Sequence, residues 1–389
     1  MARKISFLKE FLDKESSSGA LLIAAAALGL IIANSPISDN YFDFLALGFT
    51  VENGIFYLQL TVLKIVNYGL MTIFFFVIGL EIKRELVSGH LASVKKAAMP
   101  FIAALGGMAL PAWVYLAIAG DVAPEGWAVP VATDIALAVG LLAMMGPTVT
   151  QSLRSFLLAL AVIDDIGAIL IIAVIYSSGI ALSWLIASIA SVALLVALQK
   201  INVTSHFILI LCGLLLWYGL YRAGLHPTLA GVILGLLAPV KGRTGTALED
   251  LETKLHPYSS LIIVPIFAMA NTGVVITEKS LTAATSSVIA WGIFVGLVVG
   301  KPLGVLASAL AASKARIAQL PEDASIGKLA ATGSAAGIGF TVALFIADLA
   351  FENQELQNIA VVAIIAASVL SALLSTLIFT IYRSNPTQS

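Results

Sequence analysis

Long apolar runs, separated by short polar or Gly/Pro-rich stretches, occupy most of the chain. A run of about 20 apolar residues is long enough to cross a bilayer as a helix. The pattern therefore predicts twelve membrane-spanning helices. They lie near residues 19–34, 60–82, 97–119, 127–145, 153–177, 181–199, 205–222, 226–240, 257–276, 286–312, 327–350 and 358–382.

The composition is typical of an integral membrane protein. Of the 389 residues, 60% are hydrophobic and 11% are charged, whereas soluble domains carry about 25% charged residues. The formal net charge is −1 and no block of basic residues is present, so we expect no nucleic-acid partner. The single cysteine, Cys212, excludes an internal disulfide. We interpret residues 1–389 as one integral membrane domain.

Basic residues are distributed unevenly when the connections are assigned alternately to two sides. One side holds Arg222 and Lys279, and Lys64 and Lys301 lie inside apolar runs. The other side holds Arg3, Lys4, Lys9, Lys14, Lys83, Arg84, Lys95, Lys96, Arg154, Lys200, Lys241, Arg243, Lys254, Lys314, Arg316, Lys328 and Arg383. The positive-inside rule places this richer side in the cytoplasm.

This assignment puts both termini, residues 1–18 and 383–389, in the cytoplasm, together with a loop over residues 241–256. The basic N-terminus and the apolar stretch after it also resemble a secretory signal. We interpret that stretch as a retained first span, because many spans follow it.

Residues 45–59 predict a β-hairpin on the non-cytoplasmic side. Two short runs rich in β-branched and aromatic residues flank Asn53-Gly54, which is a strong hairpin signal. An isolated two-stranded ribbon is only marginally stable in water. Pairing of its edge with a second copy would make the protein a homodimer, and a simple loop is an equally open interpretation.

Asp164 and Asp165 lie in the middle of the apolar run 153–177. A charge at this depth costs at least ~2.5–3.5 kcal/mol, so such residues are usually functional. A structural alternative is a buried ion pair for each aspartate, but few basic residues lie inside the runs.

Two further runs contain features that interrupt helices. Pro130 and Asp134 lie in the run 127–145, and the run 327–350 contains ATGSAAGIGFT. Glycines in membrane helices also serve close packing. Interrupted helices at matching positions of two halves of a chain are typical of a transporter's ion site.

Five motifs follow one another along the chain: VPVATDIALAVG, LALAVIDDIGAILII, HPTLAGVILG, VVGKPLG and GIGFT. In this order they closely resemble the NhaA-type bacterial sodium/proton antiporter family. The resemblance covers nearly the whole chain.

The resemblance implies an all-α membrane protein with an inverted-topology repeat, made of helices 3–5 and 10–12. Helices 4 and 11 would be discontinuous and cross at mid-membrane, where a cytoplasmic funnel ends. The implied protein is a multi-pass antiporter of the bacterial inner membrane that exports Na⁺ or Li⁺ in exchange for H⁺. It serves sodium and pH homeostasis and needs no cofactor.

Matching positions in the motifs imply the residues of the site. Asp164 and Asp165 would bind Na⁺ or Li⁺, Thr133 and Asp134 would lie at the crossing, and Lys301 would lie opposite them. The implied pH-response residues are Glu81, Arg84, Glu85, Glu252 and His256 at the funnel rim and His226 at the start of helix 8. Packing or capping is an equally open role for His226, and the rim charges could be ordinary interfacial ion pairs.

The physical chemistry is consistent with exchange. Sodium and lithium are hard cations that prefer oxygen ligands, and a carboxylate binds them only after it has released its proton. Ion and proton therefore compete for one site. We expect more protons than sodium ions to move in each cycle, with an ion pair between Asp165 and Lys301 that breaks and re-forms. We also expect Asp134 to compensate the positive ends of the broken helices and Lys301 the negative ends.

Other classes of protein fit less well. Intramembrane aspartyl proteases need a Gly-x-Gly-Asp motif, and this chain has GIGF. Prenyl transferases need aspartates spaced to hold magnesium and diphosphate, and the turn after Asp165 contains no carboxylate. A passive sodium channel is the remaining alternative, but it would not need an intramembrane lysine.

Overall fold

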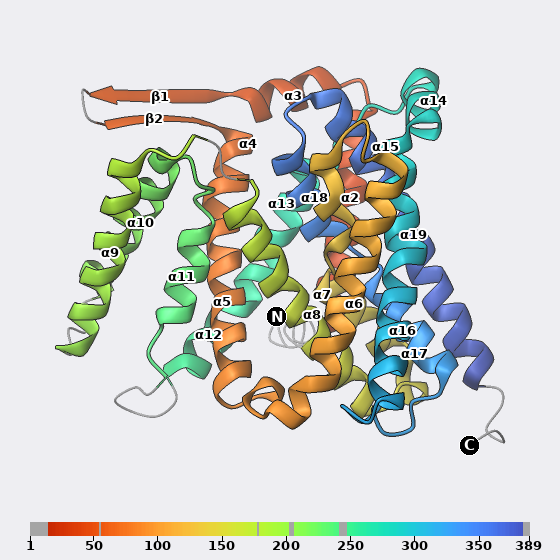
Figure 1. Ribbon diagram of the computed structural model, residues 1–389. Coiled ribbons are helices and arrows are strands. Elements are labelled where there is room, and N and C mark those ends of the chain that lie inside the picture. The colour runs from red at the N-terminus through yellow and green to blue at the C-terminus, as the bar shows by residue number, and fades with distance from the viewer. Residues whose placement is uncertain (1–14, 54–55, 177–178, 202–205, 241–246, 384–389) are drawn as a thin grey trace, which may run out of the picture.

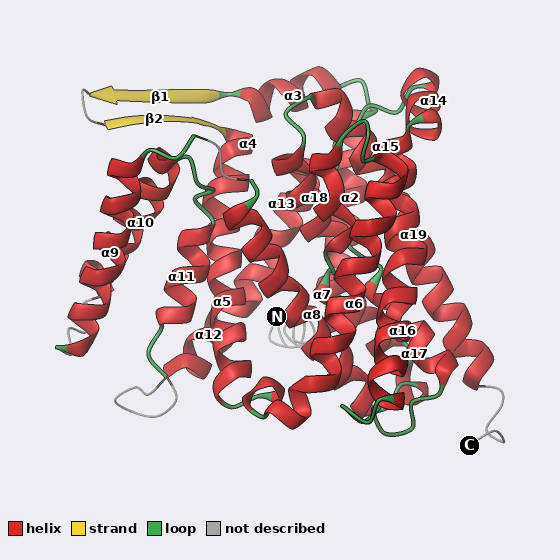
Figure 2. Cartoon of the chain, viewed as in Figure 1, coloured by secondary structure: helices red, strands yellow, loops and turns green. Residues whose placement is uncertain are grey.

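The computed structural model describes residues 15–53, 56–176, 179–201, 206–240 and 247–383. These residues are mostly helical, with one small two-stranded sheet (Figure 2). The α-helices are α2 (Glu15–Ala33), α3 (Ser38–Ala46), α4 (Val62–Lys64), α5 (Met71–Val87), α6 (Val94–Ala119), α7 (Ile135–Met144), α8 (Gln151–Val174), α9 (Leu182–Lys200), α10 (His206–Ala223), α11 (Leu229–Leu237), α12 (Ala247–Tyr258), α13 (Val264–Asn271), α14 (Glu278–Ser286), α15 (Val288–Val295), α16 (Lys301–Lys314), α17 (Ile326–Ala336), α18 (Phe340–Ala350) and α19 (Gln354–Arg383).

Six shorter segments have other helical geometries. The 3₁₀ segments are η2 (His90–Ala92), η3 (Pro124–Val131) and η4 (Gly146–Thr148). The π-helical segments are η1 (Ile65–Leu70), η5 (Ser259–Ile263) and η6 (Gly296–Gly300). Each π-helical segment continues directly into the α-helix that follows it, so η1 with α5, η5 with α13 and η6 with α16 form longer rods.

The chain is a multi-pass membrane protein. Within the described ranges, seven helical stretches are long and apolar enough to cross a membrane, or nine if each of two bent helix pairs counts as one span. Every one of the twelve predicted runs coincides with helix, but some helices are short. At 1.5 Å per residue, the nine residues of α11 span about 14 Å, less than the ~30 Å of a bilayer core. The number twelve therefore stays a prediction.

The predicted hairpin is present, shifted by two or three residues from the range 45–59. Strands β1 (Gly48–Asn53) and β2 (Phe56–Thr61) pair antiparallel, with Gly48 opposite Thr61, and the two turn residues lie outside the described residues. Figure 1 shows the hairpin at one end of the molecule with α3 and α14, while α5 and α9 end at the opposite end. We call these ends the hairpin face and the opposite face.

Aromatic contacts hold the hairpin against α10. The ring of Phe56 stacks on Tyr218 at 4.7 Å between centroids, and the Tyr57 amide donates to the Tyr218 hydroxyl at 3.0 Å. All six residues of β1 are exposed. The hairpin is therefore anchored through β2 and leaves β1 at the surface.

The predicted loop over residues 241–256 is largely a helix, so that prediction was wrong in part. Residues 247–256 belong to α12, and residues 241–246 lie outside the described residues. Leu248, Leu251 and Leu255 recur at intervals of three and four residues, which is the spacing of an amphipathic helix. Leu248 and Leu80 belong to one small apolar cluster, which holds α12 against α5.

Glycines allow the closest helix pairs to approach. A Cβ on Gly231 of α11 would lie 2.0 Å from the Thr72 carbonyl oxygen of α5, and one on Gly304 of α16 would lie 2.2 Å from the Gly106 carbonyl oxygen of α6. Packing through small residues drives helix association in lipid, where apolar burial gives little advantage. These two contacts brace the helices that flank the centre of the protein.

Two helices are interrupted near the middle of the molecule. The chain is extended at Ala132 and Asp134 between η3 and α7, and α17 and α18 meet at a 47° bend over residues 337–339. The two interruptions touch, because the Asp134 amide donates to the Ile338 carbonyl at 2.6 Å. Gly337 is needed here for space, since a Cβ would lie 2.6 Å from the Leu297 carbonyl oxygen.

Candidate ion-binding site

Asp134 lies where two helix N-termini converge. Its Oδ1 accepts a hydrogen bond from the Leu137 amide in the first turn of α7, at 3.0 Å. Its Oδ2 accepts from the amide and the hydroxyl of Thr341 at the start of α18, at 3.0 and 2.6 Å. Helix N-termini carry partial positive charge and unpaired amides. One buried carboxylate thus caps both half-helices that begin at the crossing.

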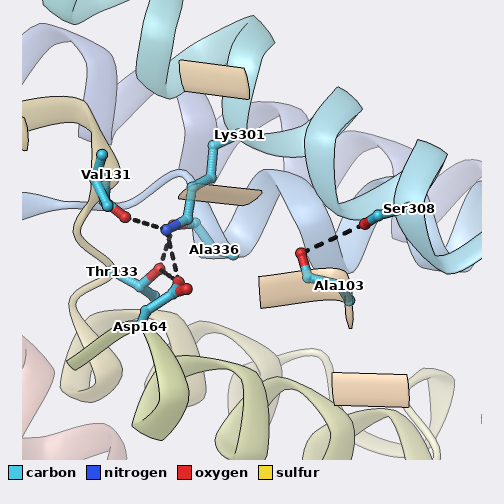
Figure 3. A network of polar contacts seen from close by, with 7 residues as sticks. All are labelled: Ala103, Val131, Thr133, Asp164, Lys301, Ser308 and Ala336. Atoms are coloured by element: carbon cyan, nitrogen blue, oxygen red, sulfur yellow. Dashed lines mark hydrogen bonds and ion pairs between the residues drawn. The ribbon is translucent and has the colours of Figure 1, made fainter. Parts of the chain in front are cut away.

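Lys301 points from α16 toward Val131 and Asp164, as Figure 3 shows. Its ammonium donates to the Val131 carbonyl at the C-terminal end of η3 and pairs with Asp164 Oδ2 at 2.6 Å. Both residues are 0% exposed. A buried ammonium group needs such partners to offset the loss of its hydration.

The expected pairing of Lys301 with Asp165 was wrong, because Lys301 pairs with Asp164. Adjacent residues on a helix point about 100° apart, so only one of two neighbouring carboxylates can face the lysine. Asp165 faces a cavity instead. The two aspartates therefore have different surroundings although they are neighbours in sequence.

Thr133 joins the interrupted helix of η3 and α7 to both α8 and α17. Its hydroxyl lies 2.8 Å from Asp164 Oδ2 and 3.0 Å from the Ala336 carbonyl oxygen (Figure 3), and its single hydrogen can be donated to one of them at a time. The hydroxyl oxygen also accepts hydrogen bonds and can ligate a cation. Thr133, Asp164 and Lys301 thus form one buried polar cluster.

Each of the two aspartates has one carboxylate oxygen that makes no hydrogen bond to the described residues. Among the described residues, Asp164 Oδ1 and Asp165 Oδ1 are buried and have no hydrogen-bond partner. Leaving a buried polar atom unsatisfied costs free energy, so each such atom in a native structure calls for an explanation. An unpaired carboxylate oxygen suits a proton or a small hard cation.

A cavity of about 370 Å³ leads from the aspartates toward the opposite face. We call it the inner cavity. Asp134, Asp165 and Thr341 line its deep part, and Glu81, Arg84, Glu252 and His256 line it nearer the ends of α5 and α12. Asp164 lies just behind the wall, on the same helix as Asp165. The cavity therefore joins residues that lie far apart in the sequence, such as Glu81 and Thr341.

The rim of the inner cavity is an ion-pair cluster. The Arg84 guanidinium lies 3.0 Å from a Glu252 carboxylate oxygen and 3.3 Å from one of Glu85. Glu85 is 3% exposed and Arg84 only partly exposed. These contacts tie the end of α5 to α12, and Glu81 lies one helical turn deeper on α5.

His226 does not belong to the rim. It lies just before α11, its Nδ1 is 2.7 Å from the Thr228 hydroxyl, and its ring packs edge-on against Tyr68 and Phe345. The ring is 7% exposed and does not line the inner cavity. Of the two interpretations open from sequence, this environment favours packing.

Thr341 is a site residue that the sequence reasoning missed. It is the last residue of the GIGFT motif, and both its amide and hydroxyl bind Asp134. A threonine in the first turn after a glycine-rich interruption is well placed to bind a group at the new helix N-terminus. That signal was available in the sequence.

Comparison with known proteins decides the family. The family model described as Na⁺/H⁺ antiporter 1 matches residues 9–379. The chain belongs to this Na⁺/H⁺ antiporter family. It is 43% identical over 373 residues to the Na(+)/H(+) antiporter NhaA of Shewanella frigidimarina, covering 94% of each chain. It is 45% identical over 352 residues to that of Shewanella oneidensis, covering 90% of each.

Proposed function

We propose that this member of the antiporter family exports Na⁺ in exchange for H⁺ at Asp164 and Asp165. The observation that carries the proposal is that Asp164 and Asp165 each have a buried carboxylate oxygen without a hydrogen-bond partner among the described residues, and that Asp165 lines the inner cavity. The relatives are named as sodium/proton antiporters, which makes the protein a transporter rather than an enzyme. Li⁺, a smaller hard cation, is proposed as a second substrate.

The proposed cycle uses competition at a single site. In the proton-loaded state, Asp165 carries a proton. Lys301 is then paired with Asp164, and this ion pair is the one present in the structure. Sodium from the inner cavity binds Asp165 after its proton leaves, and then Asp164, which releases Lys301. A lysine that loses its counter-ion in a dry site gives up its proton. Two protons are then exchanged for one sodium ion, and the site is presented to the other side of the membrane.

At the crossing, two charged side chains compensate the partial charges at the ends of the broken helices. Asp134 compensates two helix N-termini, and Lys301 compensates the C-terminal end of η3. Because Asp134 keeps its contacts with both helix N-termini, the crossing can tilt as a unit while Asp164 exchanges Lys301 for Na⁺. We assign Asp134 and Lys301 to this electrostatic role, and Lys301 to proton transfer as well.

Such a cycle moves net charge. In proteoliposomes, an imposed pH gradient is expected to drive Na⁺ uphill, and a membrane potential is expected to change the rate, because two positive charges cross against one. The measurement is ²²Na⁺ flux with and without a valinomycin-set potential. Protein-free vesicles are the control. A rate indifferent to the potential would mean one-to-one exchange, and Na⁺ flux that only follows the Na⁺ gradient would mean a channel.

We further propose that the rim cluster adjusts activity to pH. An exchanger that imports protons would acidify the cell unless it stopped at low pH. The Arg84 bridge to Glu252 joins α5 to α12, and protonation of that carboxylate would weaken it. His256 lines the same cavity, and histidine is the side-chain type that most often acts as a pH switch near neutrality. Movement of the ends of these helices would then open or narrow the inner cavity.

The rim proposal predicts a shift that Na⁺ cannot remove. Competition at the aspartates alone would move the acid limb of the activity profile to lower pH without limit as Na⁺ rises. A separate sensor leaves a pH floor, a lower limit of activity that added Na⁺ cannot move. Glu252→Gln is expected to shift this floor by about half a pH unit or more. A shift of one pH unit corresponds to about 1.4 kcal/mol. The measurement is the profile at saturating Na⁺, with exposed Glu322→Gln as the matched control. An unmoved floor would make the rim an ordinary ion-pair cluster.

Topology and assembly complete the proposal. We propose that the chain crosses the inner membrane of a bacterium twelve times and contains an inverted repeat. Both termini would lie in the cytoplasm, and the hairpin would lie on the periplasmic side. The rich basic content near the opposite face supports this orientation. We also propose a homodimer through the hairpin, because β1 is an exposed edge strand that offers unpaired backbone groups.

A further inference from the structure

A second cavity opens near the hairpin face. Its volume is about 470 Å³, and it lies among α3, α13, α18 and the start of α19. We call it the outer cavity. Its polar lining residues are Thr61, Asn271, Asp348, Gln354, Gln357 and Asn358. Asp348 is the one charged residue among the described residues that line it, so the cavity combines a single carboxylate with several amide oxygens.

An amide network fixes Asp348 at the cavity wall. The Asn67 side-chain nitrogen donates to Asp348 Oδ2 at 3.0 Å and to Asn271 Oδ1 at 3.1 Å. The Asn271 nitrogen donates back to Asn67 Oδ1 at 2.9 Å and to the Phe267 carbonyl at 2.8 Å. A carboxylate can accept about four hydrogen bonds. The contact with Asn67 uses one of these positions and orients the group.

Helix α18 connects this cluster to the central site. Thr341 and Val342 line the inner cavity, and Leu344, Ala347 and Asp348 line the outer cavity. Asp348 lies seven positions after Thr341, which is about 10 Å along the helix. Both cavities are thus lined by one half-helix that begins at the Asp134 cap.

Aromatic rings lie between the two cavities. Phe345, halfway between Thr341 and Asp348, is 0% exposed and packs on Phe75 and Phe267 at 5.2 and 6.2 Å between centroids. These rings separate the two cavities along α18, and the outer cavity beyond them has Asp348 as its one charged residue among the described lining residues.

We propose that Asp348, together with the Asn271 amide oxygen, forms a cation station in the outer cavity that holds Na⁺ between the central site and the solution at the hairpin face. The inference rests on the proposed sodium exchange and adds a second site to it. One carboxylate with neutral oxygens suits a monovalent cation, because sites for divalent cations gather more oxygen ligands and more charge. A single negative charge also binds weakly enough for rapid release.

The station predicts a one-sided kinetic defect. With vesicles sorted by orientation, Asp348→Asn is expected to raise the KM for Na⁺ presented at the hairpin face by about fivefold to tenfold, the effect of losing about 1–1.4 kcal/mol. The KM for Na⁺ at the opposite face and the maximal rate are expected to stay within about twofold of wild type. Exposed Glu352→Gln, in the loop between α18 and α19, removes a charge at the same end and is the matched control.

Two further variants decide between this station and a structural role. Lys64 is near enough to interact electrostatically with Asp348, so the carboxylate could serve only as its counter-ion. In that case Lys64→Gln would restore the KM of Asp348→Asn, whereas the station predicts no rescue. If Asp348→Asn does not fold, Asn271→Ser is expected to give the same one-sided shift.

The proposal is overturned by an unchanged KM at the hairpin face, by equal shifts at both faces, or by rescue through Lys64→Gln. These results differ from a failure of the antiport proposal itself. In that case the wild-type protein would show no Na⁺-driven proton movement from either face.

Discussion

Proteoliposomes that contain Asp164→Asn or Asp165→Asn protein are expected to exchange Na⁺ for H⁺ at least about a hundredfold more slowly than wild type, because losing one buried charged ligand costs about 3 kcal/mol or more. Both carboxylates are buried, and each has an oxygen without a hydrogen-bond partner among the described residues. The measurement is the initial rate of Na⁺-driven proton movement, followed with a pH-sensitive dye. Exposed Asp121→Asn is the matched control.

The two variants are expected to differ in stability. Asp164→Asn removes the counter-ion of Lys301, whereas Asp165→Asn leaves the ion pair between Asp164 and Lys301 intact. Thermal unfolding in detergent should therefore show a lower Tm for Asp164→Asn and a nearly unchanged Tm for Asp165→Asn. Undiminished exchange by either variant would contradict the assignment of that residue to the ion site.

Replacement of Lys301 by alanine is expected to destabilise the protein by about 3–5 kcal/mol, the usual cost of removing one partner of a buried ion pair. The change leaves Asp164 charged without a counter-ion and removes the donor from the Val131 carbonyl. Lys301→Arg keeps the positive charge and should retain most of the stability. Thermal unfolding of the three proteins in the same detergent measures the difference.

Lys314→Ala is the matched control for this comparison, because Lys314 is exposed at the far end of the same helix, α16. Its loss is expected to change stability by less than about 0.5 kcal/mol, as for most surface substitutions. A Lys301→Ala protein as stable as wild type would refute the role of Lys301 at the crossing.

The main features of the fold could be predicted from the sequence where the bilayer strongly constrains it, namely in the length of apolar runs and in the cost of buried charges. Apolar length located the helices, and the signal at Asn53-Gly54 located the hairpin. A carboxylate is costly enough at membrane depth that Asp134, Asp164 and Asp165 stand out. The structure brings Asp134 to both helix N-termini of the crossing and Asp164 beside Lys301.

Other features depend on contacts that no local pattern specifies. Which aspartate meets Lys301 depends on the rotation of α8 about its axis, and the sequence alone does not fix that rotation. The helix α12 was taken for a loop, because its polar residues outweigh the narrow apolar stripe that packs on α5. The rule that singled out Asp164 also applies to Asp348 in the run 327–350, but no motif drew attention to it.

The central claim is that Na⁺ and protons compete for Asp164 and Asp165, and proton release on Na⁺ binding tests it most directly. In weakly buffered detergent solution near neutral pH, addition of Na⁺ is expected to release more than one proton for each Na⁺ bound by the wild-type protein. The double variant Asp164→Asn/Asp165→Asn is expected to release none, and choline chloride provides the ionic-strength control. Release of the same number of protons by the double variant would contradict the account.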